Sequence, residues 1–481
     1  MSLPSIAEQI SESFTAAPAL PCVAGGSCVT HVDALTGLAA RASALAWFDK
    51  HLRTHAQPAG VILLSIDRFG LVNASLGHRT GDGLLVQLAQ RVEATVRSEL
   101  GPNAAERVRV ARTGGSEFAV LASALPDGVA LDALADRLDH DLAQPVEVES
   151  HQLQVRATLG VAARTPRSGS PRAEGEAVFR DAQIALRQAK LSLATRATFD
   201  PAMREQVCRR MQLELALHHA LRHGGLSLNY QPIISFATGE VAGFEALVRW
   251  TDPVLGAISP AEFIPIAEET GLVLPLGEWV LSEACRQLAA WRCDGLADPT
   301  VTMSVNLSRV QMHQQDLVAM VLARVEEAGL CPGAGDLHLE VTESSIMTDP
   351  QRAVAVLHDL RKAGVSISMD DFGTQYSSLA CLHQFPLNTI KIDRAFIRNL
   401  DQRREYGAVV HAIVTLAHNL DMKVVAEGIE TADQAVELLA MECDAAQGYH
   451  FARPLAAADA GHYLATYQPP ALGQARATLA A

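Results

Sequence analysis

The sequence lacks a long apolar run, a basic leader and any closely paired cysteines. No stretch approaches the roughly 18 apolar residues of a membrane-spanning helix, so we expect no membrane segment. Met1–Leu20 carries acidic residues but no basic cluster, which argues against a secretory signal. The eight cysteines form no C-x-x-C pair. Scattered cysteines are typical of reduced core residues, so we expect a cytoplasmic protein.

Positive charge is also scarce. The chain has 39 Lys and Arg residues against 54 Asp and Glu residues, a formal net charge of −15. Broad binding to nucleic acid polymers requires a basic surface, so we expect no such partner and disfavour a general nuclease. An acidic protein that acts on phosphates needs local cations, which metal ions can supply. The 481 residues are enough for two or three domains.

Two adjacent carboxylates stand out in the stretch Ser366–Thr374, which begins as an apolar strand and reaches Asp370 and Asp371 before Gly373. Neighbouring side chains of a strand point to opposite faces, so the two aspartates can converge only where the strand is ending. Like charges repel unless a cation lies between them, and oxygen ligands suit magnesium, manganese or calcium. The alternative is an Asp-rich turn or a helix N-cap.

The surrounding sequence favours the metal interpretation. Strand-like segments, mostly separated by helix-length stretches, occur at Leu226–Ile234, Gly243–Trp250, Val301–Ser308, Asp336–Ser344, Val365–Gly373, Thr389–Phe396, Lys423–Glu430 and Ala446–Phe451. Nearly all carry polar residues late in the run, namely Gln231, Glu245, Asn306, Glu340 with Glu343, Asp370 with Asp371, Lys391 with Asp393, Glu427, and Gln447. This pattern predicts a (β/α)₈ TIM-like barrel, whose active site lies at the C-terminal strand ends. Because buried unpaired carboxylates are costly, a metal cluster would account for such a ring.

The region before the barrel has the pattern of a separate α/β domain. Val61–Ile66 indicates a buried strand and Gly83–Leu100 a helix. Two apolar runs flank Gly114-Gly115 within Val108–Leu121, which is a β-hairpin signal. We expect tails at 1–30 and 471–481, the α/β domain at 31–195, a connecting helix at 196–212 and the barrel at 213–470.

The connecting helix has an apolar stripe, with Met203, Val207, Met211 and Leu215 spaced by four residues. Such a stripe packs against another surface. It is consistent with packing between domains, with a signalling helix or with a dimer seam.

The first domain resembles a GGDEF domain, the diguanylate cyclase family. The motifs that carry the resemblance are Asp33–Leu38, Ser65–Phe69, Asn73, Leu76–His78, Gly81-Asp82 and Arg112–Phe118. The family binds metal and GTP phosphates with two carboxylates, but Ser65 and Ser116 stand at those positions here and Gly70 replaces the usual lysine. A serine hydroxyl is a poor Mg²⁺ ligand, so the resemblance implies a domain without cyclase activity.

The guanine-facing positions of this family are retained as Asn73 and Asp82. The resemblance therefore implies that the domain could bind GTP as a regulator; the alternative is that both residues serve turns and helix caps. The family's inhibitory product site is not expected, because Ala105 and Val108 occupy its positions. Residual cyclase activity would need an improvised metal site, for which Asp67 and Glu117 are the nearby carboxylates.

Residues 213–470 resemble an EAL domain, the cyclic di-GMP phosphodiesterase family. The motifs occur in the family's order as Tyr230–Pro232, Glu245–Trp250, Ser259–Leu272, Ser304–Ser308, Glu340–Glu343, Asp370–Thr374, Lys391–Asp393, Ala426–Gly428 and Gln447–Tyr449. The family fold is a (β/α)₈ barrel in which the first strand runs antiparallel to the others. The resemblance therefore implies hydrolysis of cyclic di-GMP to the linear dinucleotide pGpG, with two divalent cations, Mg²⁺ or Mn²⁺.

The resemblance also implies a role for each motif residue. One cation would be held by Glu245, Asn306, Glu340 and Asp370, and a second by Asp370 and Asp371 with the support of Glu427. Lys391 and Glu427 would serve catalysis, and the substrate would contact Gln231, Arg249, Asp393 and Gln447. Glu343 would steady the loop after Asp371, in which Gln375 replaces the family's usual glycine. The alternatives are a plain salt bridge for Lys391, and stacking on Trp250 or a surface pair for Arg249.

We therefore expect a cytoplasmic, homodimeric phosphodiesterase whose first domain is an inactive regulator. Two alternatives stay open: a non-enzymatic cyclic di-GMP receptor, and a bifunctional enzyme with residual cyclase activity. A receptor usually lacks part of the metal set, and this chain has every member of it.

Overall fold

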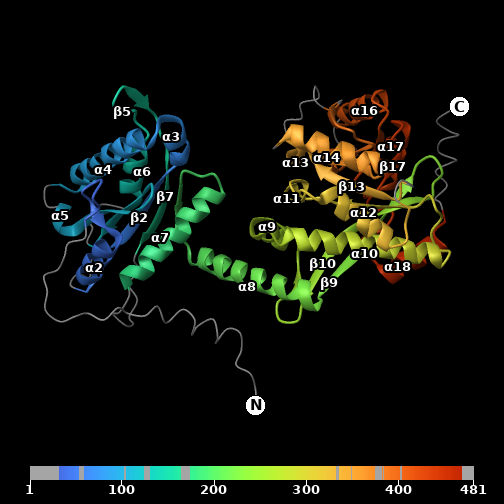
Figure 1. Ribbon diagram of the computed structural model, residues 1–481, viewed down its shortest axis with the longest axis horizontal. Coiled ribbons are helices and arrows are strands. Elements are labelled where there is room, and N and C mark those ends of the chain that lie inside the picture. The colour runs from blue at the N-terminus through green and yellow to red at the C-terminus, as the bar shows by residue number, and fades with distance from the viewer. Residues whose placement is uncertain are drawn as a thin grey trace, which may run out of the picture. The chain divides into compact units, whose positions relative to one another are not determined.

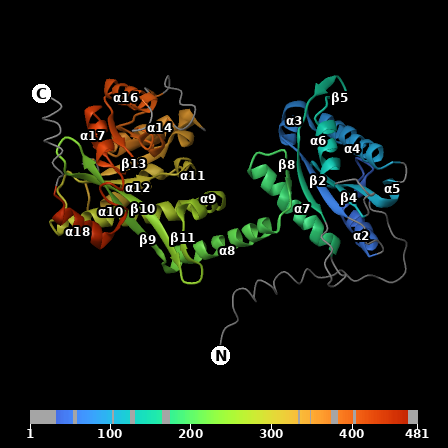
Figure 2. The same ribbon diagram turned by 180° about the vertical axis from the view of Figure 1, so that it is seen from behind.

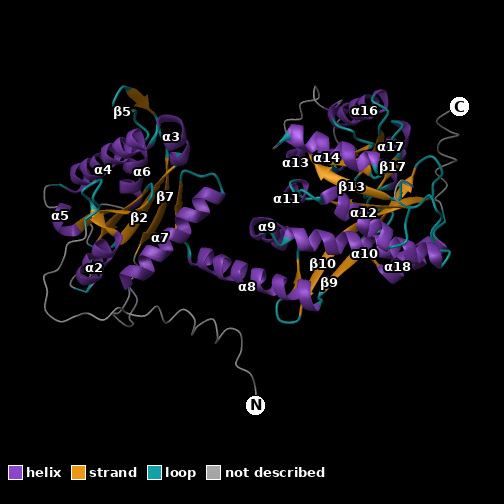
Figure 3. Cartoon of the chain, in the orientation of Figure 1, coloured by secondary structure: helices purple, strands orange, loops and turns teal. Residues whose placement is uncertain are grey.

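The computed structural model describes residues 32–53, 59–101, 104–123, 131–163, 174–331, 335–347, 349–373, 382, 384–400 and 404–468. The tails expected at 1–30 and 471–481, and Gln375, lie outside these residues. The chain divides into two compact units, Met1–Cys208 and Arg209–Ala481, which are considered one at a time (Figure 3). No helix in the described part of the chain is long and apolar enough to cross a bilayer.

The first unit is an α/β fold built on one mixed sheet. Its strands are β1 (Ala39–Ala40), β2 (Gly60–Ile66), β3 (Val108–Gly114), β4 (Glu117–Ala122), β7 (Ala157–Ala163) and β8 (Arg196–Thr198), with a separate hairpin of β5 (Val146–Val148) and β6 (His151–Leu153). Its helices are α2 (Arg41–Leu52), α3 (Phe69–Leu76), α4 (His78–Leu100), α5 (Ala104–Arg107), α6 (Leu131–Leu142) and α7 (Glu174–Leu191). The strand order is β1-β3-β4-β2-β7-β8.

The central strand β2 is buried on both faces because helices cover each side of the sheet (Figure 1). Its even-numbered apolar residues, such as Ile62, join the core formed with α4 and α6. The odd-numbered ones, such as Val61, pack with Phe48 of α2 and Phe179 of α7. The alternation of side chains along a strand thus makes a three-layer domain. The predicted hairpin around Gly114 and Gly115 is confirmed as β3 and β4.

The connecting helix predicted over Arg196–Gln212 is wrong at both ends. Arg196–Thr198 forms β8, which pairs in parallel with β7 and lies beside α7 (Figure 2). The helix α8 runs instead over Pro201–His223. Apolar spacing cannot separate a short edge strand from the first turn of a helix, because each needs only one or two buried residues.

The second unit is a closed barrel of eight strands, as predicted. Its strands are β9 (Leu226–Ser235), β10 (Val241–Asp252), β12 (Thr302–Asn306), β13 (Leu337–Thr342), β14 (Ser366–Phe372), β15 (Thr389–Ile392), β16 (Lys423–Ala426) and β17 (Ala445–Ala446), with short additions β11 (Gly256–Ile258) and β18 (Leu455–Ala456). Its remaining helices are α9 (Pro260–Thr270), α10 (Val273–Cys293), α11 (Arg309–Met312), α12 (Leu317–Glu327), α13 (Glu343–Met347), α14 (Pro350–Lys362), α15 (Arg394–Ile397), α16 (Arg404–Asn419), α17 (Ala432–Ala440) and α18 (Ala457–Thr466).

The barrel closes through β9, which pairs antiparallel with both β10 and β17, while the other strands pair in parallel. This is the arrangement that the family resemblance implied. Several strands end earlier than predicted. Glu343 opens α13, Asp393 caps α15, and Gln447 follows the two-residue strand β17. These three residues therefore stand just beyond the ends of their strands, at the face of the barrel where active sites lie.

Candidate metal and phosphodiester site

The strand register brings acidic and amide side chains to one end of the barrel. Glu245 of β10 lies opposite Gln231 of β9. Asn306, the last residue of β12, lies opposite Glu340 of β13. Asp370 of β14 lies opposite Thr342 of β13. Residues far apart in sequence are thus made neighbours by the pairing of strands, antiparallel for β9 with β10 and parallel for the others.

Lys391 of β15 lies at the centre of this group, and its side chain is only 2% exposed. Its Nζ is 2.6 Å from Glu340 Oε2 and 2.6 Å from Glu427 Oε1. It is also 3.3 Å from Asp370 Oδ1 and 3.5 Å from Glu245 Oε2. One ammonium group therefore faces four carboxylates, and the plain one-to-one salt bridge considered for Lys391 does not describe it.

Amide side chains hold Glu245 in place. Gln447 Nε2 donates to Glu245 Oε2 at 2.6 Å and to Gln231 Oε1 at 3.1 Å. Asn306 Nδ2 donates to Glu245 Oε1 at 2.8 Å, so the amide oxygen of Asn306 is the atom available to a cation. Gln231 Nε2 in turn donates to the carbonyl of Ala452 at 3.3 Å.

The carboxyl groups differ in how readily they ionise. Burial, reinforced by Glu245 and Asp370, raises the pKa of Glu340 well above its usual range. Burial and Asp370 also raise the pKa of Glu427 to about 8. For Glu245, burial is outweighed by Lys391 and the two amide donors, so its pKa is lowered. The group carries more negative charge than Lys391 can balance, and protons make up the difference when no other cation is present.

The residues present fit a divalent cation. Glu340 Oε1 and Asp370 Oδ1 are buried without a hydrogen-bond partner, although Asp370 Oδ1 lies close to Lys391. One carboxylate oxygen from each of Asp370, Asp371 and Glu427 falls within 4.8 Å of the others. Buried acceptor oxygens without donors are expensive unless a cation satisfies them, and oxygen ligands suit Mg²⁺ or Mn²⁺.

A backbone irregularity lets Asp370 and Asp371 converge. The register of β14 against β15 shifts between Met369 and Phe372, and Asp371 has a φ of 55°. The bulge breaks the strict alternation of side chains. The strand ends at Phe372, one residue after Asp371, so the two aspartates converge near the end of the strand, as expected. Neither aspartate caps a helix among the described residues, which stop at Gly373 on this side of the stretch.

The other predicted residues of this unit have varied surroundings. Arg249 Nη1 donates to the carbonyl of Val248 at 2.9 Å. Asp393 caps α15 by accepting a hydrogen bond from Ala395 N at 2.8 Å. Asp393 also interacts with Asp371. Burial and the neighbouring acids raise the pKa of Asp371 to about 6. Glu343 is buried at the start of α13, but the loop that it was expected to steady begins at Thr374, outside the described residues.

The first unit places Ser65 and Ser116 together. Ser65 is buried, and Ser116 lies beside it, because the N–H of Ile66 donates to the carbonyl oxygen of Ser116 at 3.1 Å. The nearby carboxylates already have partners. Asp67 accepts from Thr158 at 2.8 Å, and Glu117 lies 3.6 Å from Lys190. In the described part of the chain, the one acidic group spaced for a metal is that of the barrel.

The two positions predicted for GTP lie on neighbouring helices. Asn73 is on α3 and Asp82 is on α4. Asn73 Oδ1 is buried without a hydrogen-bond partner and faces Gly81, where a Cβ would come within 1.9 Å of it. Asp82 is exposed. Neither side chain forms a helix cap among the described residues, so the alternative role considered for them is not observed.

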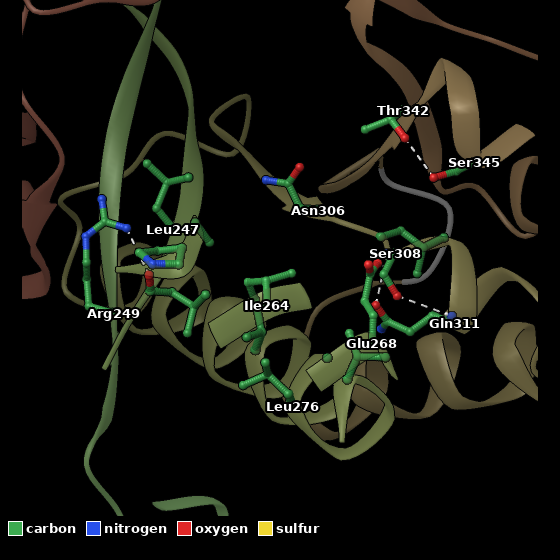
Figure 4. A pocket seen from close by; sticks show the side chains of 17 residues that line it. Leu247, Arg249, Ile264, Glu268, Leu276, Asn306, Ser308, Gln311, Thr342 and Ser345 are labelled. Atoms are coloured by element: carbon green, nitrogen blue, oxygen red, sulfur yellow. Dashed lines mark hydrogen bonds between the residues drawn. The ribbon is translucent and has the colours of Figure 1, made fainter. Parts of the chain in front are cut away.

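The sequence interpretation missed a pocket beside the barrel mouth. It has a volume of about 330 Å³, and its lining includes Glu268, Ser308 and Gln311 (Figure 4). The motif Ser259–Leu272 was recognised but no role was assigned to Glu268. A single Glu in a helical segment carries no signal that distinguishes it from a surface residue.

Family models match both parts of the chain. The diguanylate cyclase GGDEF domain matches residues 30–196, and the EAL domain matches residues 214–454. A bifunctional diguanylate cyclase/cyclic di-GMP phosphodiesterase, MucR of Pseudomonas aeruginosa, is 38% identical over 82% of this chain and 56% of its own length. The uncharacterized protein Rv1354c of Mycobacterium tuberculosis is 34% identical over 91% of this chain and 68% of its own length.

A solved structure shows the same kind of domain. The EAL enzyme Bd1971, in a form bound to cAMP and cyclic di-GMP, is 28% identical with a TM-score of 0.51 and covers 65% of this chain and 82% of that one. The chain spans only 50% to 56% of the length of several curated relatives. The chain belongs to the family of proteins in which a GGDEF domain is followed by an EAL domain.

Proposed function

We infer that this protein is a metal-dependent phosphodiesterase that opens cyclic di-GMP to linear pGpG. The observation that carries the proposal is the buried group around Lys391, in which Glu340 Oε1 and Asp370 Oδ1 have no hydrogen-bond donor. A barrel that is stabilised by packing alone does not need a buried group of carboxylates. Burying these charges is unfavourable, and a bound cation would offset that unfavourable free energy. Relatives named as cyclic di-GMP phosphodiesterases support the substrate.

The proposed roles follow from the chemistry of the side chains. Two divalent cations, Mg²⁺ or Mn²⁺, would supply an activated water and relieve charge on the phosphate. Asp370 would belong to both ligand sets, which are Glu245, Asn306, Glu340 and Asp370 for one cation, and Asp370, Asp371 and Glu427 for the other. Lys391 would orient the attacking water or neutralise the phosphate, since its ammonium group has charge but no acceptor.

The remaining polar groups would bind and orient the substrate. Gln231 and Gln447 already share a hydrogen bond, so a phosphate or sugar hydroxyl would meet a preformed amide pair. Arg249 offers unpaired donors that suit phosphate or guanine oxygens, because its contact among the described residues is a backbone carbonyl. Asp393 would complete the substrate-binding set beside Asp371.

The first domain is proposed to lack cyclase activity and to act as a regulator. The support is the pair of serines, Ser65 and Ser116, in place of carboxylate ligands, with Asp67 and Glu117 engaged elsewhere. The unpartnered Asn73 Oδ1 supports GTP binding. A homodimer in the cytoplasm is proposed as well; Met211 and Leu215 of α8 are 48% and 61% exposed and could contribute to its seam.

The test is turnover of cyclic di-GMP by the purified chain with Mg²⁺ or Mn²⁺, with and without GTP, and with pGpG measured by chromatography. Glu245→Ala should abolish hydrolysis, whereas Glu240→Ala, in the exposed turn before β10, should not. Full activity in the Glu245→Ala protein would contradict the assignment of Glu245 as a metal ligand.

The other outcomes separate the alternatives. Tight binding of cyclic di-GMP without turnover in any metal would favour a receptor. Sustained production of cyclic di-GMP from GTP and Mg²⁺ would favour a bifunctional enzyme. Turnover that rises with GTP would support a sensing role for the first domain, and turnover indifferent to GTP would leave it structural.

A further inference from the structure

The helix α8 has an exposed ridge that ends on two histidines. The exposed members of this ridge, spaced by four residues, are Met211, Leu215, His219 and His223. Residues four apart lie one above another on a helix, so the apolar pair and the histidines form one continuous row. The opposite side of the helix packs into the barrel core through residues such as Leu217.

The imidazole rings of His219 and His223 lie against one another, with centroids 4.4 Å apart and planes inclined by 37°. Neither ring forms a hydrogen bond or an ion pair with any residue that the structure describes. Other helical histidines behave differently, because Nδ1 of His51 and Nδ1 of His313 each contact the carbonyl oxygen four residues earlier, at 2.7 and 2.9 Å. The ring nitrogens of the α8 pair are therefore available to a ligand.

Two histidines one helical turn apart are a chelating arrangement for a transition-metal ion. Cβ atoms at this spacing are about 5–6 Å apart, so both rings can reach one cation, as in helical zinc motifs with two histidines four residues apart. Imidazole nitrogen suits Zn²⁺, Ni²⁺ or Cu²⁺, whereas carboxylates such as those around Lys391 suit Mg²⁺ or Mn²⁺. The pair on α8 would thus select a different class of metal from the barrel.

The pair supplies only half of a closed zinc site. Structural zinc sites are tetrahedral and have four protein ligands. Among the described residues, no third His, Cys, Asp or Glu is placed to join the pair, because the one group of three such ligands is that of Asp370, Asp371 and Glu427. A cation on the pair would still have two open positions.

A second copy of the chain can fill those positions, because the same ridge carries apolar residues. Met211 and Leu215 are 48% and 61% exposed, and covering apolar side chains with another surface is favourable in water. Rows of residues four apart interdigitate in the commonest mode of helix packing. In a two-fold dimer the same patch faces itself, so each α8 would bring its two histidines to those of the other.

We propose that His219 and His223 form half of a transition-metal site, which the same two residues of a second copy complete at a two-fold axis. The ion would be Zn²⁺ or another cation that accepts four imidazole nitrogens in a tetrahedral arrangement. The inference rests on the proposed homodimer and does not depend on the hydrolysis of cyclic di-GMP. It gives α8 a role beyond packing on the barrel, which is association that depends on metal.

The experiment uses Co²⁺ as the probe, because its visible absorption is strong in a tetrahedral nitrogen site and weak in a six-coordinate oxygen site. The full chain is titrated with Co²⁺ in excess Mg²⁺, and its mass is measured by sedimentation with Co²⁺, with Zn²⁺ and with EDTA. The variants are His219→Gln and His223→Gln. His218→Gln is the control, because His218 is exposed on the same helix but has Glu214 and Arg222, not histidines, four residues away.

The natural protein should take up about one strongly absorbing Co²⁺ for every two chains. It should also dimerise at least about tenfold more tightly with Co²⁺ or Zn²⁺ than in EDTA. His219→Gln and His223→Gln should each raise the dissociation constant of the absorbing Co²⁺ at least about tenfold, whereas His218→Gln should match the natural protein. Co²⁺ at the barrel carboxylates contributes equally to every variant, and equal melting temperatures in EDTA would show that all are folded.

One strongly absorbing Co²⁺ per chain in a monomer would overturn the shared site, as would absorption that is unchanged in both His219→Gln and His223→Gln. A dimer of equal strength in metal and in EDTA would overturn the metal dependence and leave the proposed homodimer intact. A chain that stays monomeric in every condition would overturn both the shared site and the homodimer. None of these outcomes bears on the proposed phosphodiesterase.

Discussion

Lys391 Nζ donates a 2.6 Å hydrogen bond to Glu340 Oε2 deep in the barrel, where both side chains are at most 2% exposed. The same ammonium group lies 2.6 Å from Glu427. In the absence of a bound cation, Lys391 is thus the main source of positive charge for this group. Burial alone would lower the pKa of Lys391, but the surrounding acids raise it well above its usual range.

Replacing Lys391 by methionine should destabilise the metal-free protein. Removal of one partner leaves buried carboxylates without compensation, which typically costs about 3–5 kcal/mol. Urea unfolding in EDTA measures the loss, and Mn²⁺ should restore more stability to Lys391→Met than to the natural protein. Lys362→Met, which removes an exposed pair with Asp359, should change stability by less than about 0.5 kcal/mol. A Lys391→Met protein as stable as the natural one in EDTA would contradict the role assigned to this charge.

Asp371→Asn should weaken metal binding without unfolding the barrel. The residue contributes one of the three clustered carboxylate oxygens, and affinity for hard cations depends on ligand charge. We expect at least about a tenfold increase in the Mn²⁺ concentration needed to raise the melting temperature. Asp421→Asn is the matched control, because Asp421 is also exposed and has a similar φ of 56° but lies outside the site. Equal metal responses of the two variants would remove Asp371 from the ligand set.

Carboxylates at positions 65 and 116 should introduce metal dependence into the first domain. In the double variant Ser65→Asp/Ser116→Glu, a cation could bridge the new carboxylates and the phosphates of GTP. Mg²⁺ should then strengthen GTP binding, measured by titration calorimetry, whereas it should not in the natural protein. Ser98→Asp, on the exposed side of α4, serves as the control. If Mg²⁺ already strengthens GTP binding to the natural protein, the loss of the metal site is misassigned.

His338 on β13 should make the barrel sensitive to acid. Burial, with a contribution from Lys423, lowers its pKa to about 4, compared with about 6.5 in an unfolded chain. Between these values the unfolded chain binds a proton that the native protein does not, so stability falls as the pH drops from 6.5 to 4. The slope from this group is at most about 1.4 kcal/mol per pH unit.

His338→Phe should flatten the pH dependence of urea unfolding over this window. His358→Phe, at an exposed position on α14, should leave the slope unchanged. Identical slopes for the two variants would show that carboxylate protonation alone accounts for the acid sensitivity.

The sequence was sufficient to predict the barrel and the chemical nature of its site. The pattern of apolar runs with a late polar residue located β10 with Glu245 and β13 with Glu340, because each strand of such a barrel is buried on both sides. It could not predict where strands stop. Asp393 and Glu343 follow the last strand residue and begin helices, since short loops at the barrel mouth leave no local signal between the two elements.

The residue types, their order and their alternation with helices were determined by the sequence itself, because burial and backbone hydrogen bonding impose regular spacings on apolar residues. Tertiary structure decided the rest. It placed Lys391 among four carboxylates and bulged β14 so that Asp371 joins Asp370. These are relations between segments tens or hundreds of residues apart, and only the closure of the barrel fixes their distances.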